Sequence, residues 1–359
     1  MAERTPGGPP LCIAIIGAGL CGLAAAVSLR RQYHRVELMN KEIGAAISMQ
    51  VNTMCVLEYF GYNKDNLQGV DFVGIINFSS TRGEVKEMIN LKDLPDITGG
   101  RMGINCLRTD IHNELKHLAM DENGVGPPAR LHLGQEVVLC DPVEGKLTMK
   151  NGEIHDADLI IGSDGIHRVT LPEQRLGVLG LHPCRHGNVI NVVADHTDDR
   201  DQDKHAWSEI ATVEEVVEQL KHFHPRYFNF FKLGEQPIIQ WQLRALPLLP
   251  TWINGRTALL GDTVHTTLPT LGQGAAMVFE DAATIGCLIP MGTHREDIPA
   301  RLEAYQSLRK PQGELVNRES LEQTTIPSKR AQELRTVIHR YDAVEITKKY
   351  FKDHFEGAT

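Results

Sequence analysis

A glycine-rich turn near the start of the chain limits its possible folds more than any other feature. Residues 17–22 read Gly-Ala-Gly-Leu-Cys-Gly and follow an uninterrupted apolar run at residues 11–16. The alanine- and leucine-rich stretch after the turn favours a helix, and residues 35–39 favour a second strand. In such a unit the three glycines permit a tight turn, the approach of a pyrophosphate and close helix packing. The motif therefore predicts a parallel α/β sheet that binds a dinucleotide.

The residue at the end of the second predicted strand bears on which dinucleotide binds. An acidic side chain at that position usually accepts hydrogen bonds from the ribose hydroxyls. Here the position is held by Asn40, which lacks the charge that strengthens such bonds, while Glu37 falls within the strand and Glu42 beyond it. An amide beside Lys41 also suits a ribose 2′-phosphate, so an NADP-dependent dehydrogenase is one interpretation at this point.

Composition excludes several classes of protein. The 359 residues are 42% hydrophobic and 23% charged, which excludes a disordered chain and allows one large domain or two moderate ones. A net charge of −9 without a basic stretch argues against nucleic acid and membrane surfaces as partners. The seven scattered cysteines include no C-x-x-C pair and indicate free thiols. The first ten residues do not resemble a signal peptide, so we expect a cytoplasmic protein without a membrane span. We expect a monomer or homodimer.

Two further motifs place polar residues where predicted parallel strands end. Residues 158–165 read Asp-Leu-Ile-Ile-Gly-Ser-Asp-Gly, a buried strand followed by a polar turn. Residues 255–262 form another such strand, which ends in Asp262, and a glycine turn at residues 272–275 then opens a helix. Ligands of open parallel sheets collect at these strand ends. Asp262 is suited to ribityl hydroxyls, and the helix N-terminus to the negative charge of a reduced flavin.

Weaker patterns predict the remaining elements. Helices are expected over residues 50–60, 109–120, 212–223, 274–288 and 299–309, with a loosely docked helical tail from residue 330. Thr109 or Asp110 is the expected N-cap of the second of these helices. Strands are expected over residues 71–79 and 83–90, paired across the turn at residues 80–83, and over residues 188–194, 236–246 and 256–260. Hairpins are expected between residues 130 and 161.

Taken in order, the motifs resemble those of the FAD-dependent aromatic hydroxylases, the single-component flavoprotein monooxygenases of the para-hydroxybenzoate hydroxylase fold. The resemblance spans residues 11–320 and is greatest to the salicylate hydroxylase group and its relatives that modify aromatic secondary metabolites. Residues 259–283, LLGDTVHTTLPTLGQGAAMVFEDAA, carry most of its weight. It implies a Rossmann-like FAD-binding domain with an inserted, β-rich substrate domain.

The resemblance also implies a cofactor site and a reaction. FAD would bind in an extended form, with its ADP end on the first glycine motif and its ring near the third motif. The residues expected to bind it are Gly17, Gly19, Gly22, Asn40, Ala45, Ala46, Arg108, Asp164, Gly165, Asp262, Gly274 and Ala275. NAD(P)H would reduce the flavin, oxygen would form a flavin C4a-hydroperoxide, and an aromatic or polyketide-like small molecule would be hydroxylated.

Three residues are the candidates for catalysis. His182 stands in a segment, residues 181–185, that resembles the family's Tyr-Pro-x-Arg strand, and its ordinary pKa near neutrality suits a base. Arg185 ends the same segment, and Tyr227 is a candidate substrate contact. No metal is expected, because the His222-Phe223-His224 segment has no third ligand nearby in sequence.

The resemblance predicts a division of the chain. Residues 1–10 form a flexible N-terminus and residues 326–359 a helical tail. The FAD-binding domain comprises residues 11–70, 100–178 and 253–325, and the substrate domain comprises residues 71–99 and 179–252.

The chain departs from the family pattern at three points. Asn40 replaces the family's acid, the segment from Asn40 to Gly44 is short, and several tens of residues are missing between Asp164 and Arg185. That last stretch normally supplies strands of the substrate domain. Three alternatives to the hydroxylase therefore stay open: an NADP-dependent dehydrogenase, a flavin-binding protein that has lost hydroxylation, and an enzyme that catalyses epoxidation or oxidative rearrangement.

Overall fold

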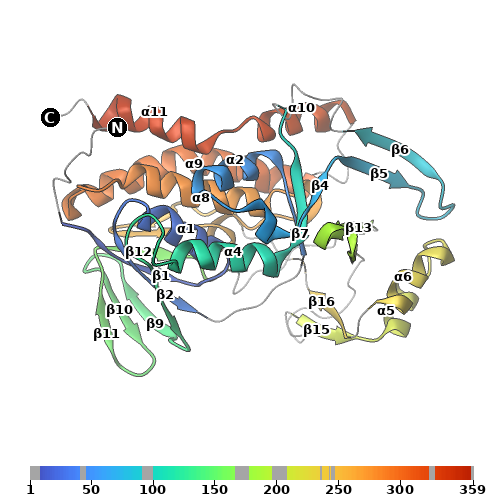
Figure 1. The fold of residues 1–359 in the computed structure, drawn as a ribbon, viewed down its shortest axis with the longest axis horizontal. Helices are drawn as coiled ribbons and strands as arrows, with labels where there is room; N and C mark the ends of the chain where they lie inside the picture. The colour runs from blue at the N-terminus through green and yellow to red at the C-terminus, as the bar shows by residue number, and fades with distance from the viewer. Residues whose placement is uncertain are drawn as a thin grey trace.

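A six-stranded sheet runs through the structure, and its central strands β12, β1 and β2 are labelled in Figure 1. The strand order is β17-β18-β12-β1-β2-β8. Its strands are β1 (Cys12–Ile16), β2 (Arg35–Asn40), β8 (Arg130–Leu133), β12 (Leu159–Gly162), β17 (Ile253–Asn254) and β18 (Thr257–Leu259). β17 pairs antiparallel with β18, and the other neighbours pair in parallel. The computed structural model describes residues 9–40, 46–90, 100–165, 178–195, 208–234, 237–241, 243, 247–322 and 328–356. The parallel α/β sheet predicted from the glycine turn is confirmed.

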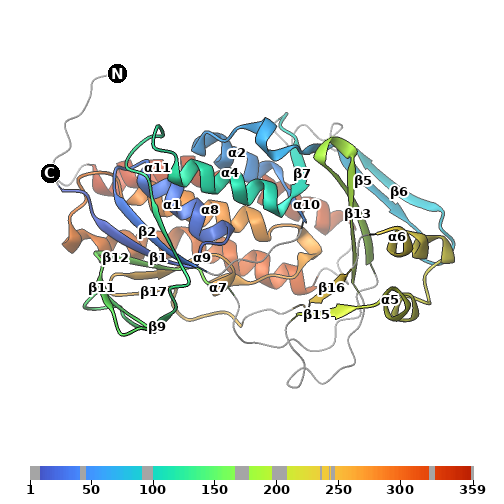
Figure 2. The ribbon, with the colours of Figure 1, turned by 60° about the horizontal axis from the view of Figure 1, so that its bottom comes forward.

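The two faces of this sheet are covered by different kinds of structure (Figure 2). One face is covered by helices α1 (Leu20–Arg30), α4 (Arg108–Met120) and α8 (Gly274–Leu288). The other is covered by a three-stranded antiparallel sheet of β9 (Val137–Asp141), β10 (Lys146–Met149) and β11 (Ile154–Asp156). Because side chains alternate along a strand, Ile13 and Ile15 pack with the helices, whereas Ala14 packs with Leu147 and Met149 of β10.

α1 is buried over its whole length, which accounts for its alanine- and leucine-rich sequence. A Cβ on Gly286 of α8 would lie 2.0 Å from the Oγ of Ser28, so a side chain there would force the two helices apart. The buried Arg30 guanidinium donates hydrogen bonds to the carbonyls of Leu118, Asp121 and Gly126. These contacts hold α1 against both α8 and the end of α4.

A small antiparallel sheet of β3 (Ala46–Met49), β7 (Gly103–Leu107) and β4 (Val70–Phe72) lies beside α2 (Val51–Phe60) and the short helix η1 (Lys64–Leu67). The strand predicted over residues 71–79 is in fact two strands. β4 pairs with β7, whereas β5 (Gly74–Phe78) forms a hairpin with β6 (Val85–Asn90). The change of partner comes at Gly74, where a Cβ would lie 2.2 Å from the carbonyl oxygen of Ile89.

Short ribbons and helices gather at the end of the molecule opposite β9–β11 (Figures 1 and 2). They include β13 (Val178–Cys184), paired with β14 (Val189–Asp195), and β15 (Ser208–Ala211), paired with β16 (Ile238–Trp241). Helices α5 (Val213–Gln219) and α6 (Phe228–Leu233) and the short helices η3 (Arg185–Gly187) and η4 (Pro225–Tyr227) complete them. One face of the β13–β14 ribbon packs on α5 and α6 in a small core of its own.

The hairpins predicted between residues 130 and 161 are confirmed for β9–β10 and β10–β11, with turns at Gly145 and Gly152. β8 differs, because it pairs with β2 at the edge of the parallel sheet. The helix predicted over residues 274–288 is confirmed as α8.

The C-terminal part is more helical and more tightly packed than expected. α9 (Ile298–Glu322) continues past residue 309 and through Pro311, with a largely buried second half. After α10 (Ser328–His339), α11 (Ala343–Phe355) lies along α8, and its Val344 and Thr347 are buried. The guanidinium of Arg301 stacks over the rings of Phe351 and Phe355. The prediction of a loosely docked tail is therefore wrong. Among the described residues, no helix is both long enough and apolar enough to span a bilayer.

Candidate functional site

The glycine turn between β1 and α1 is shaped by close backbone packing. Gly17 has φ +99°, and a Cβ there would lie 2.5 Å from the carbonyl oxygen of Ser163. A Cβ on Gly22 would lie 1.8 Å from the carbonyl oxygen of Gly17 itself. Gly19 is the N-cap of α1, and no side chain caps the helix there. The first N–H groups of α1 are therefore available to an anionic ligand.

The second and third motifs meet the first at the same edge of the sheet. The Ser163 hydroxyl, which follows β12, donates to the carbonyls of Ile16 and Gly17 at 2.9 and 3.2 Å. The Gly165 amide donates to Thr263 Oγ1 at 3.0 Å. Thr263 belongs to the four-residue helix α7 (Asp262–His265), which follows β18. Segments far apart in the sequence thus form one continuous surface.

Two opposite charges lie at this surface, one at the start of α4 and one at the start of α7. A Cβ on Gly19 would lie 3.9 Å from an Nη of Arg108, which begins α4, so the guanidinium stands beside the glycine turn. Burial lowers the pKa of Arg108, and the negative charge of Asp262 opposes that shift. Part of the Asp262 residue is exposed to solvent. Burial of its carboxyl among the surrounding groups raises the pKa of Asp262, whereas the positive charges of His265 and Arg108 lower it. Such a pair can hold phosphate oxygens and hydroxyl groups together.

The start of α8 provides a second open helix N-terminus. The short helix η5 (Pro269–Leu271) leads into Gly272, which has φ +61°, and the buried Gln273 is the N-cap of α8 without capping it through its side chain. A Cβ on Gly274 would meet nothing within 4 Å. The arrangement therefore fits an extended dinucleotide, with one helix start for its phosphates and another for its ring system.

Some of the predicted cofactor residues lie outside the described structure. These are the side chains of Asn40 and Ala46 and the whole of Ala45. Asp164 is exposed beside the Gly165 turn, and Ala275 is half-buried in the first turn of α8. The roles of these residues toward FAD remain predictions.

The three catalytic candidates do not lie together. His182 and its cross-strand partner Asn191 lie on one face of the β13–β14 ribbon. Tyr227 lies on the other face, buried in the small core, and its hydroxyl donates to the Ser79 carbonyl at 3.2 Å. Cys184 shares the face of His182 and is fully buried where β13 meets β7. His182 is thus on the face turned toward β7, and Tyr227 has a structural place.

Arg185 forms an ion pair instead of standing free. Its Nη2 and Nε donate to the two carboxylate oxygens of Asp110 in α4, at 3.0 and 3.2 Å. Asp110 therefore does not cap α4, and neither does Thr109, because the N-cap is Leu107 without a side-chain bond. The prediction of a Thr109 or Asp110 cap is wrong. The pair fastens the turn after β13 to the helix that begins with Arg108.

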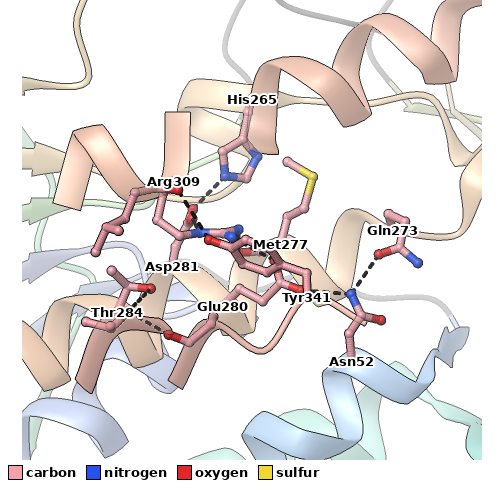
Figure 3. A network of polar contacts seen from close by, with 12 residues as sticks. Asn52, His265, Gln273, Met277, Glu280, Asp281, Thr284, Arg309 and Tyr341 are labelled. Carbon is pink, nitrogen blue, oxygen red and sulfur yellow. Dashed lines mark hydrogen bonds and ion pairs between the residues drawn. The ribbon is translucent and has the colours of Figure 1, made fainter. Parts of the chain in front are cut away.

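Sequence reasoning overlooked a buried polar network beneath the site. Glu280 and Asp281 of α8 contact Arg309 of α9, and further contacts reach His265, Gln273 and Asn52 (Figure 3). The available signal was two adjacent acidic residues inside the apolar stretch AAMVFEDAATIG. Charges in such a stretch require buried partners. Among the described residues, no group of His, Cys, Asp or Glu is arranged to hold a metal ion.

Comparison with known proteins agrees with this geometry. Residues 199–320 match a family model described as FAD binding domain. Hispidin-3-hydroxylase of Neonothopanus nambi is 35% identical, with 92% of this chain and 94% of that protein covered. The chain belongs to the FAD-dependent monooxygenase family. The FAD-dependent monooxygenase cfoG of Aspergillus candidus is 28% identical, with 86% of this chain and 84% of that protein covered.

Solved structures share the fold of this FAD-dependent monooxygenase. A salicylate hydroxylase substrate complex has a TM-score of 0.69 at 21% identity, with 97% of this chain and 95% of that chain covered. A complex of CtdE with FAD and a substrate has a TM-score of 0.76 at 17% identity, with coverages of 96% and 98%. The predicted family, fold class and FAD cofactor are confirmed, and the monooxygenase is favoured over the NADP-dependent dehydrogenase.

The alignment with the Neonothopanus nambi protein is longer than the part of this chain that it covers. It runs over 401 positions, whereas 92% of the 359 residues here is about 330, so about 70 positions have no counterpart in this chain. This agrees in size with the several tens of residues expected to be missing between Asp164 and Arg185.

Proposed function

We propose that this protein hydroxylates an aromatic or polyketide-like small molecule, with FAD as cofactor and NAD(P)H and oxygen as co-substrates. The observation that carries the proposal is the meeting of three motifs at one sheet edge, between two open helix N-termini and beside the Arg108–Asp262 pair. Bound FAD would take electrons from NAD(P)H and deliver one atom of oxygen to the substrate.

The residues of the proposed FAD site fall into two groups, those that provide space and backbone N–H groups and those that provide charged side chains. Gly19 leaves room for the pyrophosphate at the uncapped start of α1, and Gly17 and Gly22 allow the close backbone packing that shapes this turn. Arg108 would contact the ribityl–phosphate segment, and Asp262 would accept hydrogen bonds from ribityl hydroxyls. The other proposed contacts are Asn40, Ala45, Ala46, Asp164, Gly165, Gly274 and Ala275. We also propose the division into an FAD-binding domain, a substrate domain and a helical tail given above.

Removing the Asp262 carboxylate is expected to weaken FAD binding about 10- to 100-fold. A hydrogen bond to a charged group contributes about 1.5–3 kcal/mol, and Asp262→Ala removes that acceptor. Visible absorption of the purified protein gives FAD occupancy, and fluorescence titration of the apoprotein gives the Kd. Asp156→Ala, an exposed aspartate at the end of β11, is the matched control. Wild-type occupancy in Asp262→Ala would remove the residue from the site.

His182 is the proposed base that accepts a proton from the substrate hydroxyl. Burial lowers the pKa of His182, so the imidazole is neutral at pH 7 and able to accept a proton. His182→Phe is expected to lower hydroxylation by about 10²- to 10⁴-fold while FAD stays bound. Tyr227→Phe, which loses only the bond to Ser79, is the comparison. Equal turnover by wild type and His182→Phe, measured as product formed, would exclude this role.

A second candidate function is a flavin-binding protein that no longer hydroxylates. The several tens of residues expected to be missing between Asp164 and Arg185 favour it, because a shortened substrate domain would enclose less of the reaction site. The test is NAD(P)H oxidation and product formation with a panel of phenolic compounds that includes hispidin, after which the relative is named. Faster oxidation with product supports the hydroxylase. Oxidation at one rate with and without every compound, and no product, supports the second function.

A further inference from the structure

Two adjacent carboxylates are buried in α8 around a single guanidinium. Glu280 and Asp281 are 1% and 0% exposed, and Arg309 is 0% exposed. Arg309 Nη1 lies 2.8 Å from a Glu280 oxygen, and Arg309 Nε lies 2.8 Å from a carboxylate oxygen of Asp281 (Figure 3). Burying three charges is a poor way to gain stability, since apolar residues of similar volume often do as well. The arrangement therefore calls for a further role.

The Asp281 carboxylate holds the turn that delivers Asp262. Its Oδ2 accepts hydrogen bonds from the Gly261 amide at 2.9 Å and from His265 Nε2 at 2.5 Å. These two donors stand at either end of α7, whose first residue is Asp262. Gly261 has φ +65°, and a Cβ there would lie 2.8 Å from the Sγ of Cys21 in α1. One buried carboxylate thus sets the position of the proposed ribityl-binding residue.

The Glu280 carboxylate reaches the other turn through Asn52 of α2. Its Oε1 accepts a hydrogen bond from Asn52 Nδ2 at 2.8 Å, and the same Nδ2 donates to Gln273 Oε1 at 2.9 Å. Burial raises the pKa of Glu280, and the charge of Arg309 and the hydrogen bond from Asn52 oppose that rise. When Glu280 is ionised its carboxylate only accepts, so Asn52 presents its NH2 group and Gln273 its carbonyl. Gln273 is 2% exposed and directly precedes Gly274, the first residue of α8. The charge on Glu280 thereby orients the entrance to the second helix.

We propose that Glu280, Asp281 and Arg309 form a positioning unit that aligns the two cofactor-contacting turns, residues 261–265 and 272–274, with each other. Arg309 joins the two carboxylates, Asp281 holds the first turn, and Glu280 holds the second through Asn52. The inference rests on the FAD site proposed above. We call the Asp281 contacts to the turn at residues 261–265 the first arm, and the Glu280–Asn52–Gln273 contacts to the turn at residues 272–274 the second arm. The first arm is assigned to the ribityl and phosphate end of FAD and the second arm to its ring.

The two arms predict different effects on bound FAD. Asp281→Asn removes the charge and keeps the shape, so the turn of Asp262 is expected to loosen and the FAD affinity to fall about tenfold or more. Glu280→Gln is expected to keep the FAD affinity within about threefold while shifting the visible absorption maxima and the reduction potential of the flavin. Thr284→Val, in the same helix, is the control, because Thr284 bonds Thr347 at 3.3 Å and reaches neither turn.

The experiment measures the FAD Kd, the flavin spectrum, the reduction potential and thermal unfolding for each variant. Separate effects on affinity and on the spectrum, with Thr284→Val unchanged in both, support the inference. Lowered thermal stability with wild-type affinity, spectrum and potential in both charge variants overturns it and makes the unit purely structural. If a charge variant does not fold, His265→Gln tests the first arm and Asn52→Leu the second. Absence of FAD from the wild type would instead defeat the proposed function.

Discussion

Replacement of Arg309 by methionine is expected to lower the free energy of unfolding by about 3–5 kcal/mol, the usual cost of removing one partner from a buried ion pair. Methionine fills much of the space of the arginine stem but leaves two carboxylates without their shared cation. Asp281 keeps the hydrogen bonds from His265 and Gly261, whereas Glu280 keeps only the one from Asn52 among the described contacts. Urea unfolding followed by circular dichroism measures the difference.

The pH dependence of this loss follows from the pKa of Asp281. Burial alone would raise it, but the charges of His265 and Arg309 bring the pKa below its ordinary value. A carboxyl with a lowered folded-state pKa contributes stability above its unfolded-state pKa, and that contribution is lost as the pH falls through the folded-state pKa. The wild type should therefore lose this contribution of Asp281 below about pH 4. The difference in stability between wild type and Arg309→Met should shrink as the pH falls, because protonation of Asp281 and Glu280 removes the charge that Arg309 balances. Arg309→Lys keeps the positive charge, so its free energy of unfolding should lie between those of wild type and Arg309→Met. A loss of less than about 1 kcal/mol in Arg309→Met would contradict the assignment.

Gly17→Ala is expected to yield a destabilised protein without FAD. The φ of +99° is strained for alanine, which costs about 1–3 kcal/mol, and the added Cβ would lie 2.5 Å from the Ser163 carbonyl oxygen. Relieving that contact requires β1 and the turn after β12 to separate. Thermal unfolding and the visible absorption of the purified protein measure the two effects.

Gly19→Ala separates the role of the turn in folding from its role in binding. Its φ of −69° suits alanine, and its Cβ would meet only an Nη of Arg108 at 3.9 Å. We expect the apoprotein of this variant to keep the melting temperature of the wild-type apoprotein and to lose FAD affinity, because the methyl group occupies the approach of the pyrophosphate. If Gly17→Ala also kept wild-type stability, the packing argument for the turn would be wrong.

Local patterns predicted much of the fold because they report local preferences of the backbone. The apolar run before Gly17, the helix over residues 274–288 and the glycine turns of the β9–β11 hairpins each lie within one stretch of sequence. Where the partner of a strand had to be inferred, prediction was weaker. β4 and β8 were expected in hairpins, and each pairs instead with a strand that is not its sequence neighbour.

The candidate site divides in the same way. Its glycines and Asp262 could be predicted from the sequence, because each motif combines the end of a strand with a turn whose backbone conformation favours glycine. The Arg185–Asp110 pair spans 75 residues, and the Asn52–Glu280 bond spans 228. No periodicity reports contacts over such separations, because they depend on how helices and ribbons pack.

The sequence by itself determined the α/β class, the FAD cofactor and the relation to the flavoprotein hydroxylases, since glycine spacing and buried strands encode these directly. Only the tertiary structure decided that α11 docks on α8, that Tyr227 lies in a core away from His182, and that Arg309 joins Glu280 to Asp281. The physical reason is that a buried charge or aromatic ring acquires its role from the groups packed around it, and those groups come from elsewhere in the chain.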